Sequence, residues 1–135
     1  MEECISVFDM LKIGIGPSSS HTLGPWRAAE RFLAELRNNN KFELVNYIKV
    51  NLYGSLSLTG KGHATDLAIM LGLSGQDPET IPIQNIDSII KEIKEKKNIK
   101  LGNEIEIPFF LEEDIIFNKN FLPFHANGLT FTASL

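Results

Sequence analysis

The chain has 135 residues, of which 43% are hydrophobic and 22% are charged, a balance typical of one globular domain that can bury its own core. Its formal net charge of −4 argues against a dedicated nucleic-acid-binding protein, because such proteins concentrate basic residues on one face. The single cysteine, Cys4, excludes an internal disulfide framework and a metal site built from this chain's thiols alone. No apolar run approaches the ~20 residues that span a bilayer, and we expect no signal peptide and a cytoplasmic protein.

Two helices are expected in the first forty residues. Ser6 and Asp9 have the spacing of a capping-box variant, which predicts a short helix that ends at Gly14. Pro25 fits the first turn of a second helix, and the asparagines at 38–40 would end it. The apolar residues of this second helix recur at the 3.6-residue spacing of one buried stripe. They are Trp26, Ala29, Phe32, Leu33 and Leu36.

A strand and two further helices are expected next. Residues 45–53 alternate between apolar and polar, which predicts a half-buried strand that leads into a polar, glycine-rich segment. Helical spacing of apolar residues from Leu67 predicts a helix that ends around residues 72–75. Isoleucines 86, 89, 90 and 93 predict another amphipathic helix, and the alternating Lys and Glu of residues 91–100 are typical of its solvated face.

The last third of the chain is expected to be rich in strands. Short alternating or apolar runs predict strands at residues 104–107, 115–117 and 129–135. A turn is expected at residues 125–128, which read His-Ala-Asn-Gly. The final expected strand is still under way at Leu135, and we therefore expect a longer natural protein.

Residues 16–22, Gly-Pro-Ser-Ser-Ser-His-Thr, form the most informative segment of the sequence. One Ser or Thr is enough to cap a helix, so this run of hydroxyl side chains exceeds what capping requires. Free N–H groups and the positive end of a helix dipole attract carboxylate or phosphate. The segment therefore predicts a pocket for a small anion, lined by Ser18, Ser19, Ser20, His21 and Thr22.

All three histidines, His21, His63 and His125, fall in polar segments. Each is able to move a proton near neutral pH, or simply to order its loop by bonding to backbone groups. Their wide spacing gives little support to a zinc site. The segment at 60–63 lacks the Gly-Lys-Ser/Thr end of a phosphate-binding P-loop. Residues 14–16 lack the third glycine of a dinucleotide fingerprint and follow an expected helix, so nucleotide binding is not expected.

The chain resembles the N-terminal β domain of the bacterial iron–sulfur L-serine dehydratases. The matching motifs follow one another along nearly the whole chain, and their order makes the resemblance specific. They are SVFD at 6–9, IGIGPSSSHT at 13–22 with Gly24-Pro25, YGSL at 53–56, TGKGH at 59–63 with Thr65-Asp66, and His125 with Asn127-Gly128.

The resemblance implies a fold, an activity and roles for named residues. It implies a compact single α/β (α+β) domain with a mixed sheet packed by three to four helices, similar to the allosteric substrate-binding domain of some phosphoglycerate dehydrogenases. The family converts L-serine to pyruvate and ammonia, and its [4Fe-4S] cluster is held by cysteines of a catalytic α domain that this chain lacks. In that chemistry His63 would remove the Cα proton, residues 18–22 would hold the substrate carboxylate, and Thr65 and Asn127 would add hydrogen bonds.

Three functions remain open from the sequence. The chain either contributes residues to a lyase when it is joined to its catalytic α domain, or it is a serine-sensing and packing module, or it is an ordinary anion-binding protein. Alone it is expected to be inactive. The sequence does not decide whether the catalytic domain is fused or a separate subunit, or whether the enzyme forms a homodimer as family members often do.

Overall fold

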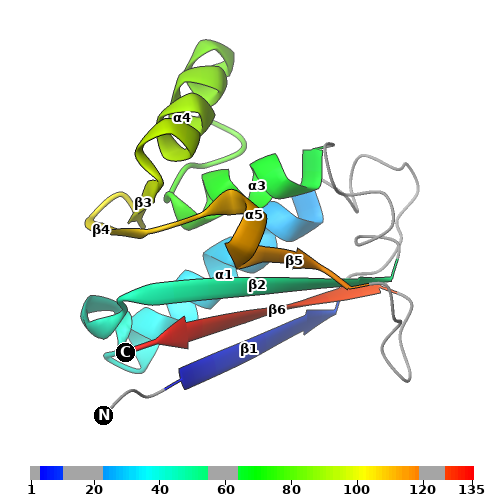
Figure 1. Ribbon diagram of the computed structural model, residues 1–135, viewed down its shortest axis with the longest axis vertical. Coiled ribbons are helices and arrows are strands. Elements are labelled where there is room, and N and C mark those ends of the chain that lie inside the picture. Colours follow the sequence, from blue (N-terminus) through cyan, green and yellow to red (C-terminus); the bar gives the residue numbers. More distant parts are fainter. Residues whose placement is uncertain (1–3, 11–22, 55–63, 119–126) are drawn as a thin grey trace.

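A four-stranded sheet forms the base of the molecule (Figure 1). The computed structural model describes residues 4–10, 23–54, 64–118 and 127–135. The strands are β1 (Cys4–Met10), β2 (Tyr47–Gly54), β5 (Ile115–Phe117) and β6 (Asn127–Ser134), in the order β1-β6-β2-β5. Because β6 is antiparallel to both β1 and β2, whereas β5 is parallel to β2, the sheet is mixed, as predicted.

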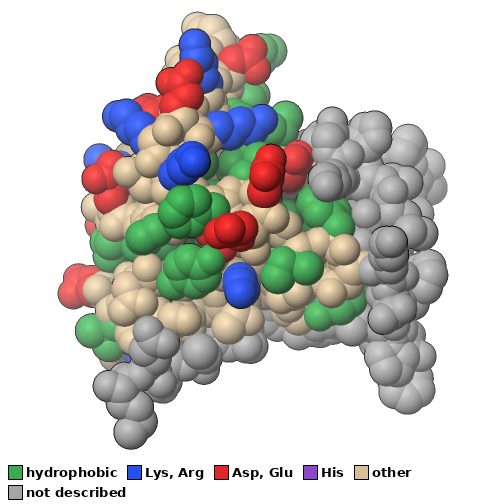
Figure 2. Space-filling model, viewed as in Figure 1, with side chains coloured by type: hydrophobic (Ala, Val, Ile, Leu, Met, Phe, Trp, Pro, Cys, Tyr) green, Lys and Arg blue, Asp and Glu red, His purple; other side chains and the backbone are tan. Residues whose placement is uncertain are grey.

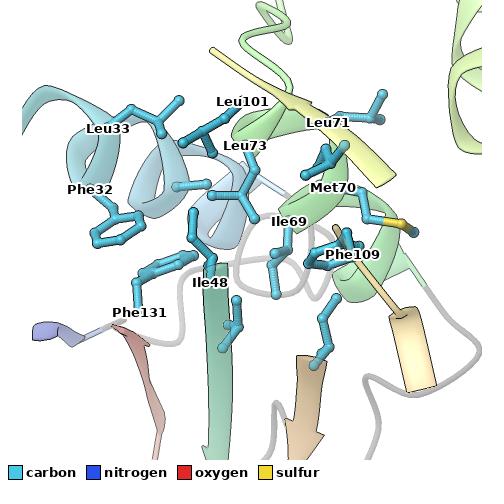
Figure 3. Packing of buried hydrophobic residues seen from close by; sticks show 14 of the residues in the cluster. Phe32, Leu33, Ile48, Ile69, Met70, Leu71, Leu73, Leu101, Phe109 and Phe131 are labelled. Atoms are coloured by element: carbon cyan, nitrogen blue, oxygen red, sulfur yellow. The ribbon is translucent and has the colours of Figure 1, made fainter. Parts of the chain in front are cut away.

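One face of this sheet is apolar and carries the core (Figure 3). Successive residues of a strand point to opposite faces, so the alternation of β2 and β6 divides them into a buried and a half-exposed set. Helix α1 (Gly24–Asn38) packs on the buried face, where the rings of Phe32 and Phe131 stack with their centroids 4.9 Å apart. The buried residues of the two strands are Ile48, Val50, Leu52, Leu129, Phe131 and Ala133.

Helix α3 (Ala64–Leu73) lies at the centre of the second layer. From Thr65 onward its side chains are buried on every side except at Leu67. Around it lie α1, the amphipathic helix α4 (Ile83–Lys96), and a hairpin of β3 (Asn98–Leu101) and β4 (Ile105–Pro108). A helix apolar on all sides needs such an enclosure. Two short helical turns complete the described chain, η2 (Phe42–Leu44) and α5 (Leu111–Asp114).

Most predicted elements are confirmed. The buried stripe of α1, the end of α3 near residue 73 and the amphipathic character of α4 all agree with the periodicity of the sequence. The four helices α1, α3, α4 and α5 of the described ranges and the mixed sheet confirm the α+β class. The similarity to the regulatory domain of phosphoglycerate dehydrogenases stays a prediction.

The helix predicted from Ser6 and Asp9 is wrong, because both residues lie within strand β1. Seven residues of β1 pair with β6, and this pairing outweighs a local spacing that only resembles a capping box. The related expectation that residues 14–16 follow a helix is also wrong, because the described element before them is strand β1. Residues 91–100 are also not one helical face, because α4 ends at Lys96, Lys97 adopts a left-handed φ of 56°, and β3 begins at Asn98. Asn127 and Gly128, expected in a turn, already belong to β6.

Asp114, which is fully buried, ties α5 to the sheet. Its Oδ1 accepts a hydrogen bond from the Tyr47 hydroxyl, and its Oδ2 accepts one from the backbone N–H of Phe110 at 2.7 Å. A buried carboxylate without such donors would be strongly destabilising. The pair therefore holds the start of β2 and the α5–β5 junction together.

We predict that Tyr47→Phe lowers the free energy of unfolding by about 1–3 kcal/mol, because it removes a donor from a buried carboxylate. Urea denaturation followed by circular dichroism measures the change. Tyr53→Phe, the same change in the same strand, is the matched control and should have a smaller effect. Equal effects of the two substitutions would contradict the assigned role of Asp114.

Burial and the hydrogen bond to Asp114 raise the pKa of Tyr47 to about 12 from the usual 10.0. A raised pKa means that the folded state favours the neutral phenol, so its contribution to stability is complete below pH 10 and is lost as the pH rises towards 12. We expect the stability difference between the native chain and Tyr47→Phe to shrink over this interval. A difference that stayed constant with pH would contradict the assignment.

Candidate functional site

The last residues of β1, β2 and β5 and the first residues of β6 lie at the same end of the sheet. Met10 of β1 and Tyr53 of β2 both pair with Gly128, near the start of β6, and Gly54 pairs with Asn127. Phe117, the last residue of β5, pairs with Leu52 in the same region. The described chain thus leaves β1, β2 and β5 and enters β6 at this end of the sheet. We call this end, formed by the strand termini, the site edge.

The chain segments that hold most predicted site residues all attach to the site edge. Residues 11–22 follow β1, residues 55–63 follow β2, and residues 119–126 connect β5 with β6. These segments lie outside the described residues, and with them the following predicted site residues. They are Ser18, Ser19, Ser20, His21, Thr22 and His63. The structure describes the ends of the strands that flank these segments, and those ends lie together at the site edge.

Two helices begin above the site edge (Figure 1). α1 starts at Gly24, two residues after the predicted anion segment, and α3 starts at Ala64, directly after His63. At the start of α1 the structure describes no capping side chain and no acidic residue in the first turn. Free N–H groups and the positive helix dipole at such a start favour an anion.

The first turn of α3 contains one of the two described residues of the predicted site. Thr65, a predicted substrate-binding residue, is fully buried, and Asp66 next to it is 9% exposed. The Asp66 Oδ1 accepts a hydrogen bond from the backbone N–H of Leu67 at 2.9 Å. Asn127, the other placed candidate, is the first residue of β6 and pairs with Gly54. Asp66 is not among the site residues predicted from the sequence.

Close packing joins the first two turns of α1 to the last turn of α3. At Gly72 of α3, a Cβ atom would lie 2.7 Å from the Ala29 Cβ and from the Trp26 carbonyl oxygen, so no larger residue fits without a shift. The Trp26 indole N–H also donates to the Gln76 carbonyl oxygen at 2.8 Å. The two helices are therefore held together behind the site edge.

A groove among the described residues lies apart from the predicted site. This groove of about 450 Å³ runs between the end of α4 and α5, with Phe109 and Phe110 among its lining residues and Lys94 and Glu113 beside them.

Figure 2 shows that acidic and basic side chains alternate over α4, and two pairs on this helix are Lys91–Glu95 and Lys96–Glu92. Such exposed pairs contribute little to stability, and they mark a solvated surface.

The described residues do not fit a metal cluster. They contain no group of three His, Cys, Asp or Glu side chains that could hold a metal ion. The whole chain has one cysteine, whereas a [4Fe-4S] cluster is usually held by four thiolates. A cluster held by four thiolates would need at least three of them from outside this chain. Within the described ranges, no helix has the length and apolar character needed to cross a membrane.

These features define an α+β domain whose polar segments are gathered at one sheet edge. Residues 6–135 match the family described as serine dehydratase beta chain, and the chain belongs to this family. L-serine dehydratases of Haemophilus influenzae and Streptomyces coelicolor are 47% and 46% identical over 96% of the chain. L-serine dehydratase 1 of Escherichia coli is 44% identical over 93% of it. The chain spans only 28–29% of the length of these three relatives.

We predict that Gly72→Ala destabilises the fold by about 1–3 kcal/mol, the usual cost of overpacking. Helix propensity alone predicts the opposite sign, because Ala is favoured over Gly inside a helix by roughly 0.5–1 kcal/mol. Urea denaturation followed by Trp26 fluorescence measures the effect. A gain in stability would show that α1 and α3 do not pack as closely as described.

Proposed function

We propose that this chain is the β part of an L-serine dehydratase and contributes residues to the conversion of L-serine to pyruvate and ammonia. The observation that carries this proposal is membership of the serine dehydratase beta chain family over residues 6–135. The relatives named L-serine dehydratase support it through their similarity over nearly the whole chain. Because the chain spans only 28–29% of the length of those relatives, we assign the rest of the enzyme to another part of the protein.

In this proposal the carboxylate of L-serine binds to residues 18–22. These residues precede the start of α1, whose described first turn carries no competing acidic side chain. Backbone N–H groups and the helix dipole attract an anion there, and Ser and Thr hydroxyls add donors. Thr65 and Asn127 add hydrogen bonds to the bound substrate, and both belong to elements that begin at the site edge.

His63 is the proposed base that removes the Cα proton of L-serine. It directly precedes the first residue of α3, and the positive end of a helix dipole favours the neutral imidazole. A neutral imidazole has a free nitrogen lone pair and accepts a proton at physiological pH. We assign the [4Fe-4S] cluster, and the Lewis-acid chemistry that it supplies, to the catalytic part of the enzyme.

The test is an anaerobic assay of pyruvate formation by the complete enzyme, with this chain joined to its catalytic part and the cluster reconstituted. We expect His63→Ala to lower kcat by about 10²–10⁴-fold, the usual contribution of a general base. Cluster content and thermal unfolding of the variant serve as controls. A serine-sensing module would need a carboxylate site but no base, so turnover within a few-fold of the native enzyme would contradict the catalytic role.

A further inference from the structure

We infer that the groove between α4 and α5 is a docking surface for the catalytic part of the enzyme, and that it takes an amphipathic helix of that part. The apolar face of this helix lies on Phe109, Phe110 and Leu111. Its acidic flank faces α4, and its basic flank faces α5. The inference rests on the proposed function, because that proposal assigns the rest of the enzyme to another part of the protein.

The floor of the groove is apolar. Phe109 is buried, whereas Phe110 is 38% exposed and Leu111 is half-buried. Single exposed apolar side chains are common on protein surfaces, but three consecutive apolar residues along one groove form a contiguous patch. Such a patch, with an aromatic side chain at its centre, is typical of an interaction surface.

Charges of opposite sign stand on the two sides of the groove. Lys94 and Lys97, at the end of α4, line one side, and Glu112 and Glu113 of α5 line the other. Within the described ranges, no ion pair joins these lysines to these glutamates. Figure 2 shows basic, acidic and hydrophobic side chains together between α4 and α5. An apolar centre with a charged rim is typical of a protein–protein interface, and the two signs favour a partner with the opposite charges.

Hydrogen bonds hold the two sides of the groove in place. The Phe109 N–H donates to the Lys97 carbonyl oxygen at 3.0 Å, which joins the end of α4 to the segment before α5. The Phe110 N–H donates to the buried carboxylate of Asp114 at 2.7 Å. A surface that is already ordered loses little conformational entropy on binding. The groove is therefore preorganised for a partner.

The surroundings of the groove favour a helix as its occupant. An extended segment binds by pairing with a free sheet edge, but helices form both sides of this groove and use their backbone groups internally. A small-molecule site has a few polar groups that converge on the ligand, whereas here the charges stand on opposite sides of an apolar floor. An amphipathic helix presents an apolar stripe between charged flanks, which matches this pattern.

The position of the groove favours the rest of the enzyme as the partner. The groove contains no predicted site residue, but a second hollow of about 430 Å³ adjoins it at Lys94 and reaches Leu67 of α3, two residues after Thr65. On the other side, α5 leads directly into β5, which ends at the site edge. The chain spans only 28–29% of its relatives, and a part that completes the site edge would also lie beside this groove.

The first experiment measures how fast the lysine side chains of the complete native enzyme react with an acetylating reagent, with mass spectrometry to identify each site. Lys94 and Lys97 are exposed in the described chain, as is Lys100 on β3, which does not line the groove. We expect Lys94 and Lys97 to react about 10-fold or more slowly than Lys100, because only transient opening would expose them. Equal rates would overturn the inference.

Carbodiimide cross-linking of a mixture of light and isotopically heavy complete enzyme identifies the occupant. Lys94 or Lys97 should be joined to an acidic residue of the catalytic part, and Glu112 or Glu113 to one of its lysines. Cross-links between light and heavy copies of this chain would show that a second copy fills the groove. Cross-links confined to one copy of this chain would show that nothing fills it. Either of these two results would overturn the inference.

Phe110→Asp in the complete enzyme should remove the protection, so that Lys97 reacts as fast as Lys100. Leu44→Asp is the matched control, because Leu44 is 56% exposed, belongs to η2 and does not line the groove. It should leave the protection unchanged. Protection that survives Phe110→Asp in a folded enzyme would contradict the inference. If Phe110→Asp does not fold, Lys94→Glu takes its place with the same expectation, because it sets a like charge against the acidic flank of the partner.

The acetylation rates and the cross-links do not depend on turnover, so this inference and the proposed function can fail separately. If His63→Ala abolishes pyruvate formation while Lys94 and Lys97 react as fast as Lys100, only the docking inference fails. If Lys94 and Lys97 are protected and joined to the catalytic part while His63→Ala retains turnover, the proposed role of His63 fails and the docking surface stands.

Discussion

The pairing of β6 with both β1 and β2 is the constraint on which the rest of the structure depends. Because β6 is antiparallel to both neighbours, its first residues meet the last residues of β1 and β2, with Gly128 opposite both Met10 and Tyr53. The same register points Phe131 towards the core, where it stacks on Phe32. A slip of one residue would turn Phe131 to the other face and misalign the site edge. Burial of the core and alignment of the site edge therefore have one cause.

The second layer transmits this alignment to the helix starts. α3 is enclosed by α1, α4 and the β3–β4 hairpin, and its only described polar residues before Ser74 are Thr65 and Asp66 in the first turn. Elsewhere the helix avoids the desolvation of polar groups by having apolar side chains. The contact at Gly72 prevents α3 from moving away from α1 without loss of packing. Two buried polar side chains are thus held in a rigid setting at the site edge.

The helices were predictable from the sequence because their periodicity is local, and α1 shows its buried stripe with no tertiary information. β1 was not, because Ser6 and Asp9 resemble a helix start and the strand is fixed by β6, more than a hundred residues later. The hydroxyl-rich segment at 16–22 stands out in the sequence by its composition and by its place before a predicted helix. That its neighbouring strands end at one edge depends on register, which the sequence does not display. Asp66 was overlooked because an acidic residue in a first helical turn is common, and only tertiary packing shows its burial.

The proposed function divides the active site between two parts of a protein, and the chain's own chemistry makes this division reasonable. In that proposal the chain supplies hydrogen-bond donors and a base, and the Lewis acid is assigned to the other part, in keeping with one cysteine in the sequence and no metal-binding group in the described ranges. A base is effective only within hydrogen-bond reach of the proton that it removes. Under the same proposal, docking of the two parts places the site edge against the cluster with the precision of a folded core. The close packing of α1 with α3 and the fixed register of β6 give this chain the rigidity that such docking requires.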